Sequence, residues 1–368
     1  MRVAALCSYP ASAASTRLRV LQHTDGLKLL GITVETMPFL DERTFSSLYV
    51  RSAWRTTVNG MLRATARRMM DVVTTHADVA LVQREAMLFG PPLVEWLFAR
   101  KHLPMILDLD DPTYISSPSP TYGVAGQALK WPSKTDWLIR HAALVTAGND
   151  VILEYARSKG ATARLVPTVV DTGRFMPCSP HTSPIPVFGW LGSHSTVPYL
   201  TSLFPVLEKM ALDHHFRLVV VGAGKQIKAP RGVPLELRDW ALETEVTDLQ
   251  SFDIGLYPLT DDAWAQGKSA LKAMQYMAVG VPFVASPVGA LTSIGTPGVT
   301  HLLAQTSEQW QAALTALLVN RNQRRKMGLS GRQYVTTHYP LHSATAALAE
   351  ALYAVAGVGC GRSCSSTL

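Results

Sequence analysis

Three carboxylates crowd the end of one apolar run in this sequence. Asp108, Asp110 and Asp111 lie in the stretch ILDLDDPTYI (106–115), where a predicted buried strand ends. Like charges are costly at a buried strand end unless they bind something, so at least one is a candidate site acid. A turn capped by one Asp before Pro112 is the alternative. Neighbouring strand residues point to opposite sides, so we expect only one of the candidate catalytic acids Asp110 and Asp111 to face a ligand.

A lysine pair follows a second predicted strand. Lys268 comes directly after Gly267, at a predicted helix start, and Lys272 would share its helix face. Free N–H groups at a helix N-terminus, together with a lysine, are suited to bind phosphate. A solvated lysine pair on a surface helix is the alternative.

Other candidates follow further strands. The loop 8–23 is rich in small residues and lacks GxGxxG. Arg17 and Arg19 follow these residues at a predicted helix start, and either could meet a phosphate or an acidic acceptor. Arg84 and Glu85 come at another strand end, where a structural ion pair is at least as good an interpretation.

The elements that must position these residues alternate between short apolar runs and helical segments. This rhythm predicts parallel sheets covered by helices. A proline-rich stretch (176–186) divides it into two halves, predicting domains at 1–175 and 176–340, with a C-terminal helix (342–356) packing back on the first. Two further terminal helices are expected at 307–320 and 322–337. The predicted strands are 2–7, 33–39, 78–83, 105–111, 144–149, 164–168, 187–192, 216–224, 234–240, 252–258, 281–286 and 299–304, and those of the second half are each expected to precede a helix.

The composition favours a protein that binds anionic partners and has no membrane-spanning segment. The 368 residues are 47% hydrophobic and carry a formal charge of +7, which favours anionic partners. The four cysteines form no CxxC pair, and Cys360 and Cys364 have no nearby His, so we expect reduced thiols in a cytosolic protein. No apolar run approaches the roughly 20 residues that span a bilayer.

A basic amphipathic segment spans residues 50–73. Val50, Trp54, Val58 and Leu62 form one apolar stripe, surrounded by five arginines: Arg51, Arg55, Arg63, Arg67 and Arg68. A packed helix with a solvated basic face is the commoner explanation, and a helix lying on anionic lipid is the other.

The stretch 252–290 resembles the nucleotide-sugar region of GT-B glycosyltransferases, specifically the retaining family 4. The run YMAVGVPFVAS (276–286) is similar to a run of that family, and a subgroup shares the form GK…K…QYMAxGxP. The family's glutamate pair would fall at Gly267 and Gln275. The stretches 187–200 and 147–177 support the resemblance, which implies two Rossmann-like domains facing across a cleft.

The resemblance also implies roles for particular residues. Lys268, Gly267, Ser193 and Lys272 would bind the donor diphosphate, and no metal would be required. The nucleoside would meet Gln275, Trp240, Glu245 and Gly222. Asp239 lies beside Trp240, and His194 beside Ser193 is more often a surface loop residue. The DxDD order of the three acids is also found in the subgroup, so we do not read it as the metal site of the one-domain GT-A enzymes.

The implied reaction transfers a sugar from a UDP-, GDP- or ADP-sugar to a glycan, a lipid-linked or a small-molecule acceptor. We expect a cytoplasmic enzyme of cell-envelope or polysaccharide synthesis, peripheral at the inner face of an anionic membrane. No nucleic acid partner is expected. A non-catalytic nucleotide-sugar-binding protein and a nucleotide-sugar 2-epimerase are the alternatives.

Overall fold

The structure is a computed structural model that describes residues 1–48, 50–115, 131, 133–178, 185–224 and 227–357. Its chain divides into two compact units. Unit 1 comprises Met1–Thr168 and His342–Leu368, and unit 2 comprises Val169–Leu341. Cys360, Cys364 and residues 179–184 of the proline-rich stretch lie outside the described residues.

Unit 1 is built on a six-stranded parallel sheet in the order β2-β1-β3-β4-β5-β6. Buried parallel strands read as continuous apolar runs, which is why the sequence signalled them. The strands are β1 (Arg2–Cys7), β2 (Thr33–Pro38), β3 (Val79–Gln83), β4 (Met105–Leu109), β5 (Leu144–Ala147) and β6 (Ala163–Leu165).

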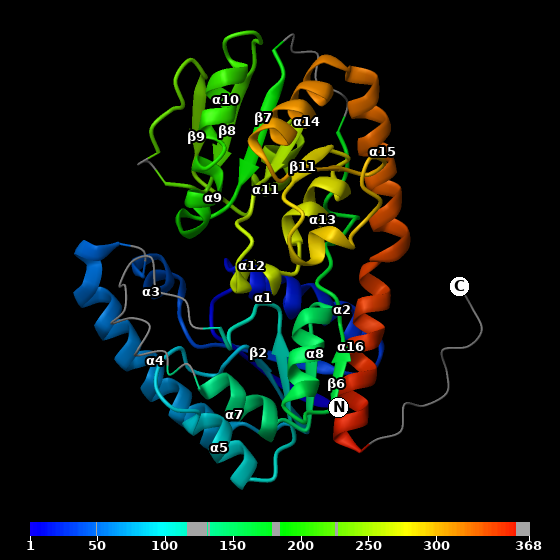
Figure 1. Cartoon of the computed structure of the whole chain (residues 1–368). Helices are drawn as coiled ribbons and strands as arrows, with labels where there is room; N and C mark the ends of the chain where they lie inside the picture. The colour runs from blue at the N-terminus through cyan, green and yellow to red at the C-terminus, as the bar shows by residue number, and fades with distance from the viewer. Residues whose placement is uncertain (49, 116–130, 132, 179–184, 225–226, 358–368) are drawn as a thin grey trace. The chain divides into compact units, whose positions relative to one another are not determined.

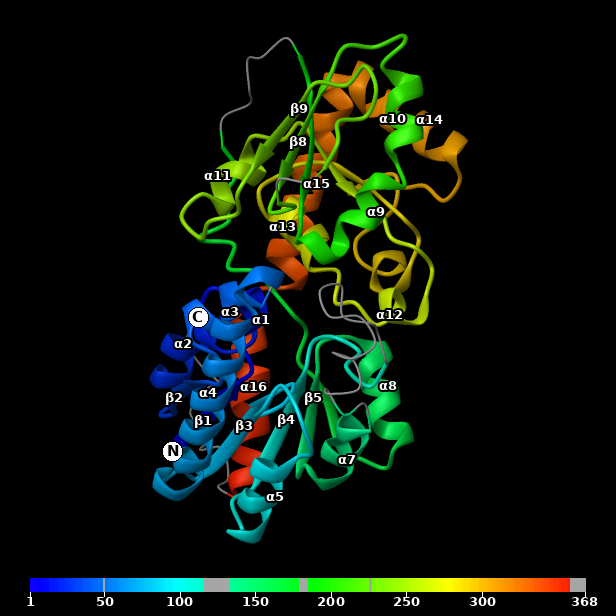
Figure 2. The same cartoon turned by 90° about the vertical axis from the view of Figure 1, so that its left-hand side faces the viewer.

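Helices cover both faces of the unit 1 sheet. One core layer holds α4 (Trp54–Thr74), α5 (Leu93–Arg100), α7 (Lys134–His141) and α8 (Asp150–Ser158), and the opposite layer holds α2 (Thr24–Leu29) and α16 (Leu341–Ala356). Figure 2 shows α4 and α5 in front of the sheet and α16 behind it. A hydrogen bond of 2.8 Å between His23 Nδ1 and Thr345 Oγ1 ties α16 to the start of the chain. The shorter α1 (Ala14–Arg19), η1 (Leu21–His23), α3 (Glu42–Ser47) and η2 (Arg51–Ala53) complete the unit.

Unit 2 repeats this plan, with the strand order β12-β11-β10-β7-β8-β9. Its strands are β7 (Val187–Leu191), β8 (Arg217–Val221), β9 (Leu235–Arg238), β10 (Ile254–Tyr257), β11 (Phe283–Ala285) and β12 (Leu302–Leu303). One face packs on α11 (Glu245–Gln250), α13 (Leu271–Ala278) and α15 (Arg321–His338), and the other on α9 (Val197–Thr201), α10 (Phe204–Met210) and α14 (Ser307–Val319) (Figure 1). The remaining elements are η3 (His194–Thr196), α12 (Ala263–Gln266) and η4 (Gly289–Thr292).

The predicted fold class is confirmed: all twelve predicted runs form strands, and both sheets are parallel. The three terminal helices also lie within two residues of their predicted ranges. One expectation is wrong, because no helix follows β8 among the described residues 222–224 and 227–234. That stretch contains Gly222, Gly224 and Gly232 with positive φ and Pro230, which do not suit a helix.

Candidate functional site

Residues 258–270 of unit 2, which contain Lys268 and form the lysine loop, lie between β10 and α13 at the carboxyl edge of the sheet. The Asp262 side chain caps α12 by accepting a hydrogen bond of 2.8 Å from the Ala265 N–H. After Gly267 the chain does not continue as a helix, because Ala270, the residue before α13, has a left-handed φ of 53°. Such a conformation costs a residue with a Cβ about 1–2 kcal/mol. Lys268 therefore lies in a link and not on a helix face shared with Lys272, which corrects the sequence-based prediction.

Lys272 lies in a box of aromatic rings. Its Nζ is 4.5 Å from the centre of the Trp190 ring and 5.4 Å from that of Tyr257. Burial, together with the positive charge of Lys268, lowers the pKa of Lys272 to about 7. The ring faces favour the charged amine, since they present negative potential to a cation.

Neither lysine has an acidic partner in the part of the chain that the structure describes. Lys268 Nζ lies 6.0 Å from the centre of the Trp264 ring, and no ion pair involves Lys268 or Lys272 among these residues. Two neighbouring amines without counter-ions destabilise each other unless an anion comes between them. This edge of unit 2 is therefore suited to bind a multiply charged anion.

Two glycine-containing loops approach each other beside the lysines. A Cβ on Gly222, whose φ is 79°, would lie 2.3 Å from the Gly192 carbonyl oxygen, so only glycine fits there. The next residue, Ser193, is exposed, and its hydroxyl lies 2.8 Å from that of Ser195. The loop after β7 therefore offers the hydroxyls of Ser193 and Ser195 at this edge of the sheet. Burial lowers the pKa of His194, which lies between the two serines.

The residues predicted to meet the nucleoside form two contacts. Gln275 Nε2 donates to Glu245 Oε1 over 3.3 Å, and both side chains are buried. Arg174 approaches the other Glu245 oxygen at 3.2 Å, so this carboxylate is already paired. Trp240 is half-buried beside Gly222, and its neighbour Asp239 is exposed.

In unit 1 the first acid of the acidic strand end belongs to the core. Asp108 accepts hydrogen bonds from Arg19 at 2.5 and 3.0 Å and from Thr146 at 2.7 Å. Arg19 is also buried and donates to the Val166 carbonyl over 2.7 Å. Burial lowers the pKa of Arg19, but the Asp108 charge outweighs it and the net shift is upward. Arg17 is buried as well, with Nη1 2.5 Å from the Ser12 carbonyl oxygen.

Asp110 and Asp111 share one arginine. Strand β4 ends at Leu109, and Arg84 bonds Asp110 at 2.6 and 2.9 Å and Asp111 at 2.5 Å. The alternation expected for a continuing strand does not apply to the two acids, because the strand stops before them. Burial raises the pKa of Asp110, but the charge of Arg84 more than offsets it and the pKa lies below its usual range. Arg84 has a left-handed φ of 65°, and strain of this kind is often found at functional sites.

Arg84 and Glu85 both form structural ion pairs, as the alternative to a site role predicts, but not with each other. Glu85 is instead 2.5 Å from Lys134 Nζ, so the two neighbours join separate ion pairs. The side chain of Asp110 is 11% exposed and that of Asp111 is 24% exposed, which leaves Asp111 the more accessible acid.

Part of unit 2 matches a known family. Residues 185–320 match the family model of the glycosyl transferases group 1. This range contains the lysine loop, the two glycine-containing loops and the buried Gln275–Glu245 pair. Over these residues the chain is similar to the group 1 glycosyltransferases.

Solved structures with the same fold cover nearly the whole chain. Sucrose-phosphate synthase from Thermosynechococcus elongatus is 14% identical, with a TM-score of 0.67 over 96% of this chain and 98% of that one. HepE from Anabaena, solved in complex with UDP and glucose, is 14% identical, with a TM-score of 0.62 over 95% and 98% of the two chains. Trehalose-6-phosphate from Escherichia coli, bound with UDP-2-fluoro glucose, is 13% identical, with a TM-score of 0.61 over 96% and 99% of the two chains. At these identities the likeness establishes the GT-B fold. No curated protein sequence matches the chain.

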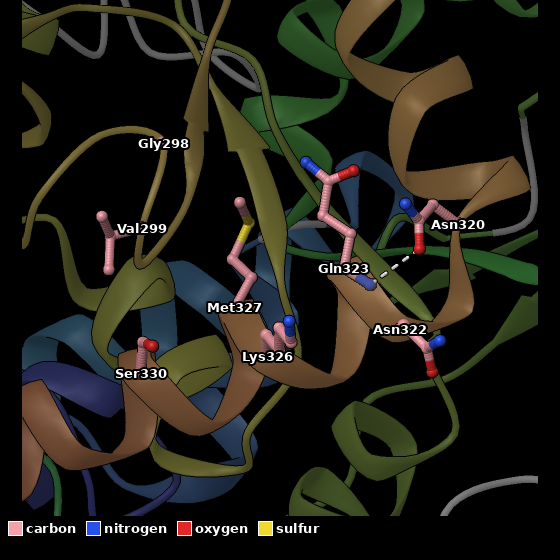
Figure 3. A pocket seen from close by; sticks show the side chains of 8 residues that line it. All are labelled: Gly298, Val299, Asn320, Asn322, Gln323, Lys326, Met327 and Ser330. Carbon is pink, nitrogen blue, oxygen red and sulfur yellow. Dashed lines mark hydrogen bonds between the residues drawn. The ribbon is translucent and has the colours of Figure 1, made fainter.

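A pocket of about 390 Å³ lies elsewhere on unit 2 (Figure 3). None of the predicted site residues lines it. Its wall is formed by the start of α15 and the loop before β12, with Gly298, Val299, Asn320, Asn322, Gln323, Lys326, Met327 and Ser330. Elsewhere in the described ranges, no group of three His, Cys, Asp or Glu residues is arranged to hold a metal ion, and no helix is long and apolar enough to cross a membrane.

Sequence reasoning missed the partners of the predicted residues. Trp190 and Tyr257 end buried strands and read as core, and nothing in their spacing signals that their rings meet Lys272. Arg174 lies in the stretch 169–177, far along the chain from Glu245. The partners of Arg84, Asp110 and Asp111, follow the neighbouring strand β4, and the pairing of β3 with β4 that brings them together is seen only in the structure.

Proposed function

We propose that this glycosyltransferase moves a sugar from a nucleotide-diphosphate sugar to an acceptor hydroxyl, with retention of the anomeric configuration. The observation that carries the proposal is the lysine pair of unit 2, Lys268 and Lys272, which has no acidic partner in the described part of the chain. A leaving diphosphate develops negative charge during transfer, and fixed positive charge stabilises it. Relatives crystallised with UDP or UDP-2-fluoro glucose support a nucleotide donor.

The two units would divide the work. Unit 2 would bind the donor: Lys268, Lys272, Gly267 and Ser193 near the diphosphate, and Gln275, Trp240, Glu245 and Gly222 near the nucleoside. Because Arg174 already pairs with Glu245, we propose that Glu245 orients the Gln275 amide and makes no direct contact with the ligand.

Unit 1 would bind the acceptor, which is a glycan, a lipid-linked molecule or a small molecule. Asp111 is the more exposed member of the acid pair on Arg84, and we propose that it contacts the acceptor hydroxyl or the transferred sugar. Arg17 and Arg19 stay predictions on this side, and their bonds to Ser12 and Asp108 favour an indirect role, through the loop and the acid that they hold. The enzyme would work in the cytoplasm, peripheral to a membrane, in cell-envelope or polysaccharide synthesis.

A donor screen followed by turnover tests the proposal. A ligand present at 100 times its dissociation constant adds about 2.7 kcal/mol of stability, so UDP-, GDP- and ADP-sugars are compared by thermal shift. The stabilising donor is then incubated with mixed acceptors, and we expect a glycosylated product with the donor's anomeric configuration. Binding without any product would favour the non-catalytic nucleotide-sugar-binding protein, and a changed donor sugar without acceptor would favour the 2-epimerase.

A further inference from the structure

Helix α4 of unit 1 exposes a row of large apolar side chains, although Met61, Ala64, Met69 and Val72 pack on the core. Its buried face contains Thr57, Gly60, Ala64, Arg68 and Val72, mostly small or polar side chains. An ordinary surface helix buries its apolar stripe and exposes its charges. The commoner explanation of this segment, a packed helix with a solvated basic face, holds for the packing of Ala64 and Val72 and for the exposed arginines. The predicted apolar stripe, however, is exposed as well.

The buried face is fixed by close contacts. A Cβ on Gly60 would lie 2.2 Å from Thr44 Oγ1, so α3 packs directly on the α4 backbone. The buried Arg68 donates to the Met37 carbonyl over 2.8 Å and lies 3.4 Å from Asp71. These contacts fix which side of α4 faces solvent.

The outward face carries a continuous apolar row. Residues four apart lie on one side of a helix, and this row runs through most of the roughly 30 Å of the helix. Its large members are 47–71% exposed: Trp54, Val58, Leu62, Met70 and Val73. Figure 1 shows α4 along one side of unit 1, and Figure 2 shows it in front of the sheet. It packs beside α5.

Exposed arginines lie beside the apolar row of α4. Arg55 and Arg63 are exposed on α4, and the Arg55 guanidinium lies 5.4 Å from the centre of the Trp54 ring. Arg67 is bonded to the Pro38 and Phe39 carbonyls at 2.8 and 2.6 Å. The one acid of the helix, Asp71, lies beside Arg68, so nothing on α4 offsets the exposed arginines.

We propose that this α4 face, defined by Trp54, Val58, Leu62, Met70 and Val73 with Arg55 and Arg63, docks on an anionic lipid surface. A single convex helix with an apolar row, a tryptophan and flanking arginines fits the boundary between headgroups and acyl chains. The net charge of +7 adds attraction to anionic headgroups. Membrane docking would bring the enzyme to a membrane-borne acceptor, and only this consequence rests on the proposed function.

Vesicle sedimentation tests this surface without donor or acceptor. The full chain is mixed with vesicles of phosphatidylcholine alone or with about one-third phosphatidylglycerol. Because each basic residue near an anionic surface contributes roughly fivefold in partition, we expect at least tenfold stronger binding to the anionic vesicles, reduced by salt. Equal binding to both vesicles, or no binding to either, would overturn the proposal.

Matched variants locate the contact. Leu62→Glu and the double variant Arg55→Glu with Arg63→Glu should each lower the partition at least tenfold. Leu212→Glu and Arg325→Glu change an exposed leucine and an exposed arginine of unit 2 and should leave it unchanged. Thermal melting verifies that each variant folds. If Leu62→Glu binds vesicles like the wild type, or if it instead dissociates a dimer of the wild type, the surface has another role.

Turnover separates this inference from the proposed function. With a water-soluble acceptor, Leu62→Glu should keep the wild-type rate while it loses vesicle binding. A protein that binds vesicles but does not transfer sugar would contradict only the proposed function.

Discussion

Lys272 couples donor binding to proton uptake if it holds the diphosphate. In the free protein, burial and the charge of Lys268 lower its pKa to about 7, so at pH 8 the amine is about nine-tenths neutral. A bound diphosphate favours the charged form and raises the pKa again. Binding at pH 8 should therefore take up about 0.9 proton, and affinity should fall about tenfold, or about 1.4 kcal/mol, for each pH unit above 7.

Calorimetry measures this uptake directly. The donor is titrated at pH 8 in two buffers with different ionisation enthalpies, and the difference in heat gives the number of protons. A nucleotide sugar is a better probe than the free nucleotide, because its diphosphate diester does not titrate near pH 7. The variant Lys272→Arg keeps its charge at pH 8, so it should bind with almost no proton uptake.

Stability of the free protein should move in the opposite direction. A lysine with a lowered folded pKa holds fewer protons folded than unfolded between about pH 7 and pH 10, so its contribution to stability rises with pH over that window. Lys272→Met should remove both pH dependences. Wild-type uptake near zero at pH 8, with binding intact, would refute the reasoning.

Three further predictions concern unit 1 and metal. Asp111→Asn should lower turnover at least about 100-fold while nucleotide binding is kept. Asp110→Asn loses a charge beside Arg84 and should mainly lower the melting temperature. Normal turnover in both variants would mean that the two acids only cap a turn. Turnover should survive EDTA, because the lysine pair supplies the positive charge, and a loss reversed by Mg²⁺ or Mn²⁺ would revive a metal role for the acids. Asp108→Leu leaves Arg19 buried without its partner and should cost about 3–5 kcal/mol of unfolding free energy in a urea titration, and a smaller loss would mean that water reaches Arg19.

The sequence predicted the strands well because each is buried on both faces. In a parallel sheet the apolar run and the strand coincide, as in RVAALC and VFGWL, and the ends differ only by a few residues. The left-handed Ala270 could not be foreseen, since alanine has no preference for that conformation and tertiary contacts hold it there. As a result, Lys268 was predicted on a helix that begins three residues later.

The local sequence pattern also could not show which face of α4 is exposed. A stripe of Trp54, Val58 and Leu62 predicts a buried face equally well, and only the contacts of Gly60 with Thr44 and of Arg68 with Met37 show which side packs. Partners of site residues were missed for the same reason. They lie on neighbouring strand ends, and their pairing depends on strand order, which a single sequence does not state.

The most direct test of the account is donor affinity in three lysine variants. Calorimetry at pH 7 compares the wild type with Lys268→Ala, Lys272→Met and Lys209→Ala, an exposed lysine of α10 that serves as the control. If Lys268 and Lys272 hold the diphosphate, each site variant loses about 1.5–3 kcal/mol of binding free energy, the range for a charge-assisted hydrogen bond, and the control binds like the wild type. Unchanged affinity in folded Lys268→Ala and Lys272→Met would contradict the assignment of this edge of unit 2 as the donor site.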